Sequence, residues 1–167
     1  RRTADRYEFL QNQATDLEAA VKSLRQIIED IDRTMAERFA AGFTEINAHF
    51  SDIFVRLFGG GSAILELSAA DNVLESGVEI FVQPPGKRRQ NLALLSGGER
   101  ALTVISILFA FLAYRPAPFC VVDEIDSALD EANVRRFSEF LTEYSQHSQF
   151  IVVTHRKGMM DAADILH

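Results

Sequence analysis

The sequence predicts an α/β domain that is preceded by a long coiled-coil helix. A regular heptad pattern fills the N-terminal part of the 167 residues, and two short apolar runs, 119–122 and 150–153, are separated by one helical pattern. A hydrophobic content of 47% is enough to build the core of one modest domain. We therefore expect a coiled-coil segment over residues 1–46 and a globular lobe over residues 47–167.

Apolar residues recur in alternating steps of four and three along the N-terminal segment. They are Leu10, Ala14, Leu17, Val21, Leu24, Ile28, Ile31 and Met35. Such a seam over about four heptads favours one helix of a coiled coil over an ordinary bundle helix, and we expect its partner helix outside this chain. Beyond residue 35 the seam becomes aromatic, which predicts that the helix docks on a globular core. The glycine run 59–61 is expected to end it as a turn rather than to cradle a phosphate.

Two segments of alternating polarity, 63–67 and 77–82, predict a pair of antiparallel strands. The turn-rich residues Asp71 and Asn72 lie between them. After the second strand, a basic cluster at 87–89 follows a Pro-Pro-Gly break. We interpret its charges as solvated, with a phosphate or DNA contact as the less favoured alternative.

Leu95, Ser96, Gly97, Gly98 and Glu99 come directly before an apolar helix that ends at residue 114. Paired glycines at a helix start let the backbone approach a ligand, and the free N–H groups with the helix dipole favour an anion. The serine adds a hydroxyl donor. The alternative is a loop that only starts a core helix.

The apolar run 119–122 leads into two adjacent acids, Asp123 and Glu124. Its lack of alternation predicts a parallel strand that is buried on both faces, and in such sheets ligands bind beyond the carboxyl ends of the strands. Asp123 could hold Mg²⁺, and Glu124 could deprotonate a water that is aimed at a γ-phosphate. The alternative is that acids here only cap the next helix, with Asp130, Asp126 or Ser127 as the N-cap.

The second apolar run, 150–153, ends close to His155. A strand–helix–strand crossover places this histidine at the same sheet edge as Glu124. A histidine there could hydrogen-bond a γ-phosphate or order the attacking water. Taken alone, a loop histidine without a task is the favoured interpretation, but the two earlier motifs make that interpretation improbable.

Composition narrows the classes of function. A net charge of -7 argues against binding nucleic acid by charge alone, so any DNA contact would be local or shared with other chains. The only cysteine, Cys120, lies inside an apolar run, which excludes an internal disulfide and favours a reducing compartment. We find no signal peptide and predict that no apolar stretch is long enough to cross a membrane, so that residues 101–113 form a buried core helix.

Together, these motifs resemble those of the ATP-binding-cassette (ABC) ATPases and, among them, the SMC (structural maintenance of chromosomes) proteins. Residues 95–99 resemble the signature loop, 121–124 the Walker B strand, 127–130 the D-loop and His155 the switch histidine. Transporter subunits of this class carry a phosphate-binding loop upstream of these motifs, whereas this chain has heptads there. Heptads in this position resemble the SMC arrangement, in which a long coiled coil and a hinge separate the two halves of the head. The sequence from residue 95 to 130 most resembles that of bacterial chromosome-condensation SMC proteins.

The resemblance implies the C-terminal lobe of an ABC-type ATPase head that uses ATP and Mg²⁺. Asp123 would serve the metal, Glu124 would be the general base, and His155 would sense the γ-phosphate. Ser96, Gly97 and Gly98 would instead close on ATP held by a second head, with Asp130 in the loop at that junction. The full set of expected cofactor-binding residues is Leu95, Ser96, Gly97, Gly98, Glu99 and Asp130. No Gly-x-x-x-x-Gly-Lys-Ser/Thr motif occurs, so the N-terminal half of the head must supply it and this chain alone is expected to be inactive.

The same resemblance implies the partners and the setting. The expected partners are the N-terminal half of the head, a second SMC head, a kleisin subunit with its C-terminal winged-helix domain, and DNA through the full complex, but no membrane. The expected location is the cytoplasm, associated with the nucleoid, and the expected process is chromosome condensation and segregation. Three alternatives stay open: a coiled-coil ATPase of DNA double-strand-break repair, a non-catalytic protein-binding scaffold, and a transporter subunit.

Overall fold

The computed structural model describes residues 2–69, 73–146 and 148–166, with side chains from residue 6 onward. The chain divides into two compact units, Arg1–Ala40 and Ala41–His167. The predicted boundary between the coiled-coil segment, residues 1–46, and the globular lobe, residues 47–167, stays a prediction. The predicted turn at Asp71 and Asn72 lies outside the described residues.

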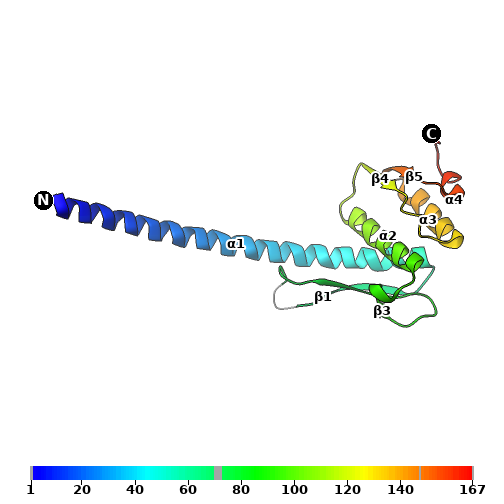
Figure 1. Cartoon of the computed structure of the whole chain (residues 1–167), viewed down its shortest axis with the longest axis horizontal. Coiled ribbons are helices and arrows are strands. Elements are labelled where there is room, and N and C mark those ends of the chain that lie inside the picture. Colours follow the sequence, from blue (N-terminus) through cyan, green and yellow to red (C-terminus); the bar gives the residue numbers. More distant parts are fainter. Residues whose placement is uncertain (1, 70–72, 147, 167) are drawn as a thin grey trace. The chain divides into compact units, whose positions relative to one another are not determined.

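The first unit consists of the N-terminal part of helix α1 (Arg2–Phe58), which is one continuous helix (Figure 1). Its predicted seam is exposed along its length: Leu17 is 66% exposed and Ile28 is 56% exposed. The apolar stripe of this helix is not covered by other residues of its own unit. Such an exposed stripe is typical of a single coiled-coil helix without its partner. The continuous helix is therefore confirmed, while its pairing with a second helix stays a prediction.

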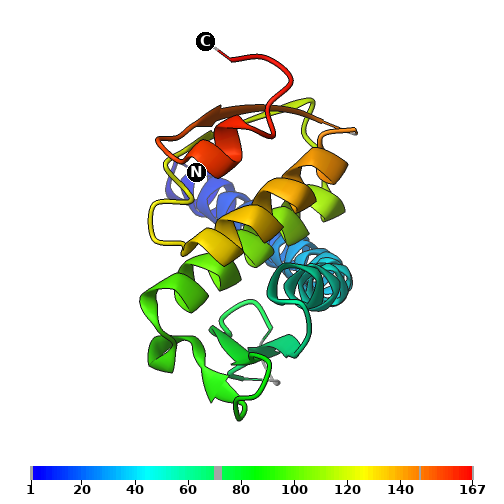
Figure 2. The ribbon, with the colours of Figure 1, turned by 90° about the vertical axis from the view of Figure 1, so that its right-hand side faces the viewer.

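The second unit is built around the last turns of α1 and two further helices. Helices α2 (Gly97–Tyr114) and α3 (Glu131–Tyr144) lie between a three-stranded sheet and a two-stranded sheet (Figures 1 and 2). Of the aromatic residues predicted to dock α1, Phe50, Phe54 and Phe58 are buried in this core, whereas Phe39 is 36% exposed. Phe109 of α2 contacts Phe137 and Phe140 of α3 edge to face, at ring-centroid distances of 6.0 and 5.0 Å.

The three-stranded sheet confirms the predicted antiparallel pair. Strand β1 (Ser62–Leu67) pairs with β2 (Val78–Gln83), which pairs with β3 (Gln90–Asn91), a strand too short to show alternation in sequence. The amide of Asn47 on α1 pairs with the peptide of Leu65 at 2.8 and 3.3 Å, so a side chain satisfies the edge of β1. Gly61 allows the entry to β1, because a Cβ there would lie 2.2 Å from the carbonyl oxygen of Gln83.

The two-stranded sheet pairs β4 (Phe119–Asp123) with β5 (Gln149–Val153) in parallel, as predicted, with Asp123 opposite Val153. The prediction that this strand is buried on both faces is wrong. Val122 is 5% exposed, whereas Val121 is 57% exposed and Ile151 is 49% exposed. Helices cover only one face of the pair, and within the described ranges nothing covers the other.

Helix α2 bears on two predictions, one about membrane-spanning stretches and one about a buried core helix. By length and composition it could span a membrane, so the prediction that no stretch is long enough is wrong. The same test is passed by core helices of soluble proteins, and α2 buries Leu102, Ile105 and Phe109 in the core of this unit. The predicted core helix is therefore confirmed. It is preceded by a short 3₁₀ helix, η1 (Leu92–Leu94), and the lobe ends with α4 (Lys157–Met160).

Candidate functional site

The first group of candidate residues lies at the carboxyl edge of the β4–β5 pair. Asp123 is the last residue of β4, and the Glu124 N–H donates to the carbonyl oxygen of Val153 at 2.9 Å, which extends the ladder by one residue. Glu124 then adopts φ 47°, a left-handed conformation that no other described non-glycine residue shares. Such a conformation costs about 1–3 kcal/mol and gathers at functional sites. The backbone therefore turns sharply at the acid predicted to act as the base.

His155 lies beside Glu124. Its Nε2 atom is 3.1 Å from Oε1 of Glu124, and both side chains are exposed, at 85% and 54%. The two residues come from the ends of neighbouring strands, so the parallel register brings them together across 31 positions of sequence. An exposed carboxylate and an imidazole in contact can accept a proton from a water and orient that water.

A buried network ties the loops that carry this pair. Asp126 is 1% exposed, and its Oδ2 accepts a hydrogen bond from the Thr154 hydroxyl at 2.6 Å. The Thr154 hydroxyl oxygen in turn accepts from the N–H of Arg156 at 2.9 Å. Asp126 lies in the loop after β4, whereas Thr154 and Arg156 lie in the loop after β5. Sequence reasoning considered Asp126 only as a possible helix cap, so this role of the residue was missed.

The guanidinium of Arg156 completes the tie. It donates to the carbonyl oxygens of Ser127 at 3.1 Å and Leu129 at 2.8 Å. Both acceptors belong to the loop that leads to α3. The signal that could have indicated the network is the Thr-His-Arg run directly after a strand, since neighbouring strand ends share an edge.

The second group of candidate residues forms the start of α2. Ser96 is the N-cap, and Glu99 accepts from its hydroxyl at 2.7 Å and from its N–H at 3.2 Å. Lys87, from the loop after β2, approaches the Glu99 oxygens to 2.8 and 3.0 Å. Partial burial raises the pKa of Glu99, but the hydrogen bonds from Lys87 and Ser96 and the charge of Lys87 outweigh it, so that pKa lies below its ordinary value.

The remaining predicted residues fall into different settings. Leu95 is 5% exposed, so its side chain belongs to the core, whereas Gly97 is exposed at the first turn of α2. A Cβ at Gly98 would lie 3.2 Å from the carbonyl oxygen of Ala128, so the loop after β4 runs against the start of α2. Asp130 caps α3, because its Oδ1 accepts from the Asn133 N–H at 2.8 Å. The capping alternative is therefore observed for Asp130, and the two groups of residues meet at this loop.

A family model described as the RecF/RecN/SMC N terminal domain matches residues 3–167. The chain belongs to the SMC family. One relative, the chromosome partition protein Smc of Bacillus subtilis (strain 168), is 55% identical over 166 residues. That match covers 99% of this chain but 14% of the relative, so the chain spans only a small part of such a protein.

Solved SMC structures confirm the predicted fold class. The Smc head domain of Pyrococcus furiosus, solved with an extended coiled coil and bound to the C-terminal domain of ScpA, is 41% identical with a TM-score of 0.79. It covers 95% of this chain, and 40% of its own length is matched. A structure from work on ATP-driven dimerization and DNA-stimulated activation of SMC ATPases is 43% identical with a TM-score of 0.73. There the match covers 77% of this chain and 78% of the other.

The acidic residues of this SMC chain can be compared with the ligands that Mg²⁺ usually takes. This ion keeps several waters and is usually held by one or two carboxylates together with substrate phosphates. Asp123 offers one exposed carboxylate at the sheet edge. Across residues 2–69, 73–146 and 148–166 there is no cluster of three or more His, Cys, Asp and Glu side chains that could hold a metal ion. The single exposed carboxylate of Asp123 fits an ion whose other ligands would be waters and the phosphates of a nucleotide.

Proposed function

We propose that this chain is the C-terminal lobe of an SMC head, which binds and hydrolyses ATP once the N-terminal half completes it. The observation that carries the proposal is the contact between Glu124 and His155 at the carboxyl edge of two parallel strands, with Glu124 held in a left-handed conformation. In open parallel sheets, this edge is where ligands bind. The chain alone is expected to be inactive, because it carries no phosphate-binding Gly-Lys-Ser/Thr loop.

In this proposal each residue of the edge has a separate task. Glu124 accepts the proton of the attacking water, and His155 hydrogen-bonds the γ-phosphate and keeps the carboxylate oriented. Asp123 would hold the Mg²⁺ that accompanies the nucleotide. When bound, this ion would supply charge neutralisation at the phosphates. The tie between Thr154 and Asp126 keeps the two loops in register while the base works.

The start of α2 acts on a different nucleotide. Gly97 and Gly98 offer backbone N–H groups at a helix N-terminus, which suits an anion, while Ser96 caps this turn and its hydroxyl donates to Glu99. We propose that they close on ATP bound by a second head, with Leu95 and Glu99 shaping the turn and Asp130 near the junction. ATP then holds two heads together, and hydrolysis releases them because the shared phosphate contacts are lost. Work on ATP-driven dimerization of SMC ATPases supports this view through a related structure.

The relatives support the partners and the setting that we propose. A related Smc head domain was solved bound to the C-terminal domain of ScpA, which supports a kleisin partner with a winged-helix domain. The Bacillus subtilis relative is a chromosome partition protein, which supports a role in chromosome condensation and segregation over a role in break repair. We propose that the complete protein acts in the cytoplasm on the nucleoid and meets DNA through the full complex.

The test is a head reconstituted from this chain and its N-terminal half, carrying Glu124→Gln. The amide keeps the size of the side chain but accepts no proton, so we expect ATP-dependent head pairs with little turnover. Wild-type heads are expected to turn over ATP and to pair only transiently. Turnover by Glu124→Gln equal to that of the wild type would overturn the assignment and favour a non-catalytic scaffold. Pairing is read by analytical ultracentrifugation and turnover by phosphate release.

A further inference from the structure

Lys87 reaches the signature loop from a separate part of the lobe. It lies in the loop between β2 and β3, and its ammonium group is 2.8 Å from one oxygen of Glu99 and 3.0 Å from the other. The Glu99 side chain is only 18% exposed, whereas Lys87 is 50% exposed. From the sequence, we interpret the basic cluster at 87–89 as solvated, with a phosphate or DNA contact as the less favoured alternative, and a contact with Glu99 is not predicted. The contact therefore links an exposed cation to a largely covered acid.

Glu99 makes this contact while it holds the serine of the signature loop. Its Oε2 atom accepts from the Ser96 hydroxyl at 2.7 Å and from the Ser96 N–H at 3.2 Å. The lowered pKa of Glu99 keeps this carboxylate ionised at neutral pH. A negative charge one hydrogen bond from Ser96 opposes the approach of a phosphate to the same turn. Something must therefore neutralise Glu99 if this turn is to accept an anion.

We propose that Lys87 is a positioning residue of the signature loop, which neutralises Glu99 and so allows the Ser96–Gly98 turn to accept the phosphates of ATP from a second head. This inference rests on the proposed function of that turn. Lys87 itself need not touch the nucleotide. It acts through Glu99, by cancelling the carboxylate charge and by holding the carboxylate where the Ser96 hydroxyl can donate to it.

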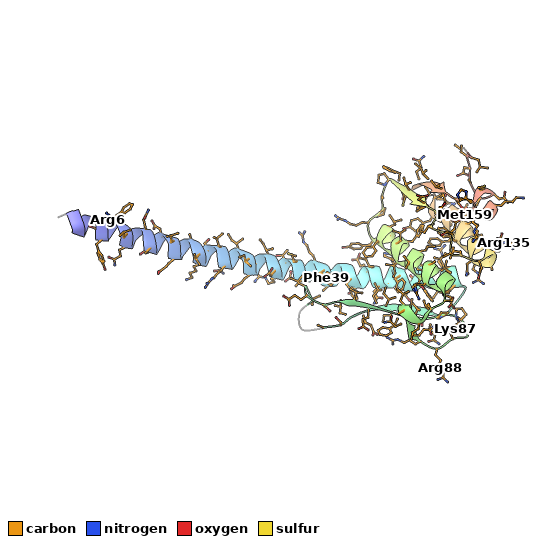
Figure 3. All side chains as sticks on the ribbon, viewed as in Figure 1. Arg6, Phe39, Lys87, Arg88, Arg135 and Met159 are labelled. Atoms are coloured by element: carbon orange, nitrogen blue, oxygen red, sulfur yellow. The ribbon has the colours of Figure 1, made fainter. Side chains whose placement is uncertain are left out.

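The neighbouring residue offers a matched control. Arg88 lies in the same loop and carries the same charge, yet it projects away from the lobe in Figure 3. No ion pair to Arg88 occurs among the described side chains. A change at Arg88 therefore alters net charge and loop composition as much as a change at Lys87, without touching Glu99.

The experiment measures head pairing in the reconstituted head with Glu124→Gln as the background, so that turnover does not interfere. The ATP concentration that gives half-maximal pairing is determined by ultracentrifugation in the presence of Mg²⁺. We expect Lys87→Met to raise this concentration about fivefold, the upper range for loss of an exposed charge pair. Lys87→Arg is expected to restore much of the loss, and Arg88→Met to leave the value unchanged.

The decisive comparison repeats the lysine change beside Glu99→Gln. Glutamine keeps an oxygen for the Ser96 hydroxyl but removes the charge, so Lys87→Met is expected to have no further effect in that background. Because the double variant lacks the same lysine, a folding defect caused by its loss would persist there. A fivefold loss in both backgrounds, or an equal loss in Arg88→Met, would overturn the inference. If the Glu124→Gln head does not pair with ATP at all, the proposed function fails instead.

Discussion

The two loop groups that carry the predicted site residues are held in place in different ways. The edge of the β4–β5 pair is held by a buried acid, since Asp126 is 1% exposed and hydrogen-bonded to Thr154. The start of α2 is held by an ion pair whose cation, Lys87, is 50% exposed. A buried polar network is costly to break, whereas an exposed pair contributes little and responds to salt.

This difference matches the two tasks that we propose. Proton transfer at Glu124 requires distances that are fixed to within a fraction of an ångström, which a buried network supplies. Engagement with a second head must be reversible, which a solvent-accessible contact permits. We therefore expect the sheet edge to be the rigid part of the lobe and the signature loop to be its adjustable part.

The largest effect is expected from Asp126→Ala. The change removes a buried carboxylate and leaves the half-buried Thr154 hydroxyl without its acceptor, so we expect the free energy of unfolding to fall by about 2 kcal/mol. Turnover should fall as well, because the loop that carries His155 is released. Denaturant unfolding and phosphate release of the reconstituted head measure the two effects.

Asp126→Asn is the control for this prediction, because its amide oxygen can still accept the hydrogen bond from Thr154. It should recover part of the stability. A loss for Asp126→Ala no greater than the ~1 kcal/mol usual for removing a helix N-cap, measured in parallel with Asp130→Ala, would show that the edge is not held more firmly than an ordinary helix end.

A smaller effect is expected where the two loop groups touch. A methyl group at Gly98 would lie 3.2 Å from the carbonyl oxygen of Ala128, whereas nothing lies within 4 Å of one at Gly97. Both changes add the same helix propensity in the first turn of α2, so their difference isolates the contact. We expect Gly98→Ala to be less stable than Gly97→Ala by about 1 kcal/mol, because Arg156 holds the carbonyl groups on both sides of Ala128 and the loop cannot move away.

Thermal and denaturant unfolding of the two variants, side by side, provide the measurement. Equal stability would mean that the loop after β4 moves away from the added methyl group at little cost. That result would contradict our expectation that this part of the lobe is rigid. A weaker ATP-dependent pairing of Gly98→Ala than of Gly97→Ala would add that the contact also positions the signature loop.

Local patterns were enough to predict much of the molecule. The heptad seam, the strand ending at Asp123 and the glycine-led start of α2 each depend on neighbouring residues, and the structure has a helix or strand at each place. The parallel pairing of β4 and β5 followed from the strand–helix–strand order. These features depend on periodicity and turn chemistry, which a single sequence contains.

Features that depend on distant residues were not predicted. The exposed face of Val121 and Ile151 was missed, because an unbroken apolar run does not reveal whether anything covers it. The Thr154–Asp126 bond joins residues 28 positions apart, and the Lys87–Glu99 pair joins the loop between β2 and β3 to helix α2, 12 positions further along the chain. The left-handed turn at Glu124 was also missed, since a glutamate gives no local signal for positive φ.

The smallest effect concerns pH at the signature loop. Burial raises the pKa of Glu99, but the hydrogen bonds from Lys87 and Ser96 and the charge of Lys87 lower it by more, so its folded pKa lies below its ordinary value. A depressed carboxylate pKa contributes stability above the unfolded pKa, and this contribution is lost as the pH falls through the folded pKa. Because Lys87 is 50% exposed, we expect the contribution to stay below about 1 kcal/mol.

The measurement is the free energy of unfolding of the reconstituted head between pH 7 and acid, compared with Lys87→Met and Arg88→Met. The wild-type advantage over Lys87→Met should be present at neutral pH, shrink as Glu99 is protonated, and also shrink in high salt. Arg88→Met should follow the wild type throughout. An advantage that persists in acid would mean that Lys87 stabilises the lobe by packing rather than by its charge. The start of α2 would then be held as firmly against solution conditions as the sheet edge, and the contrast between the two regions would disappear.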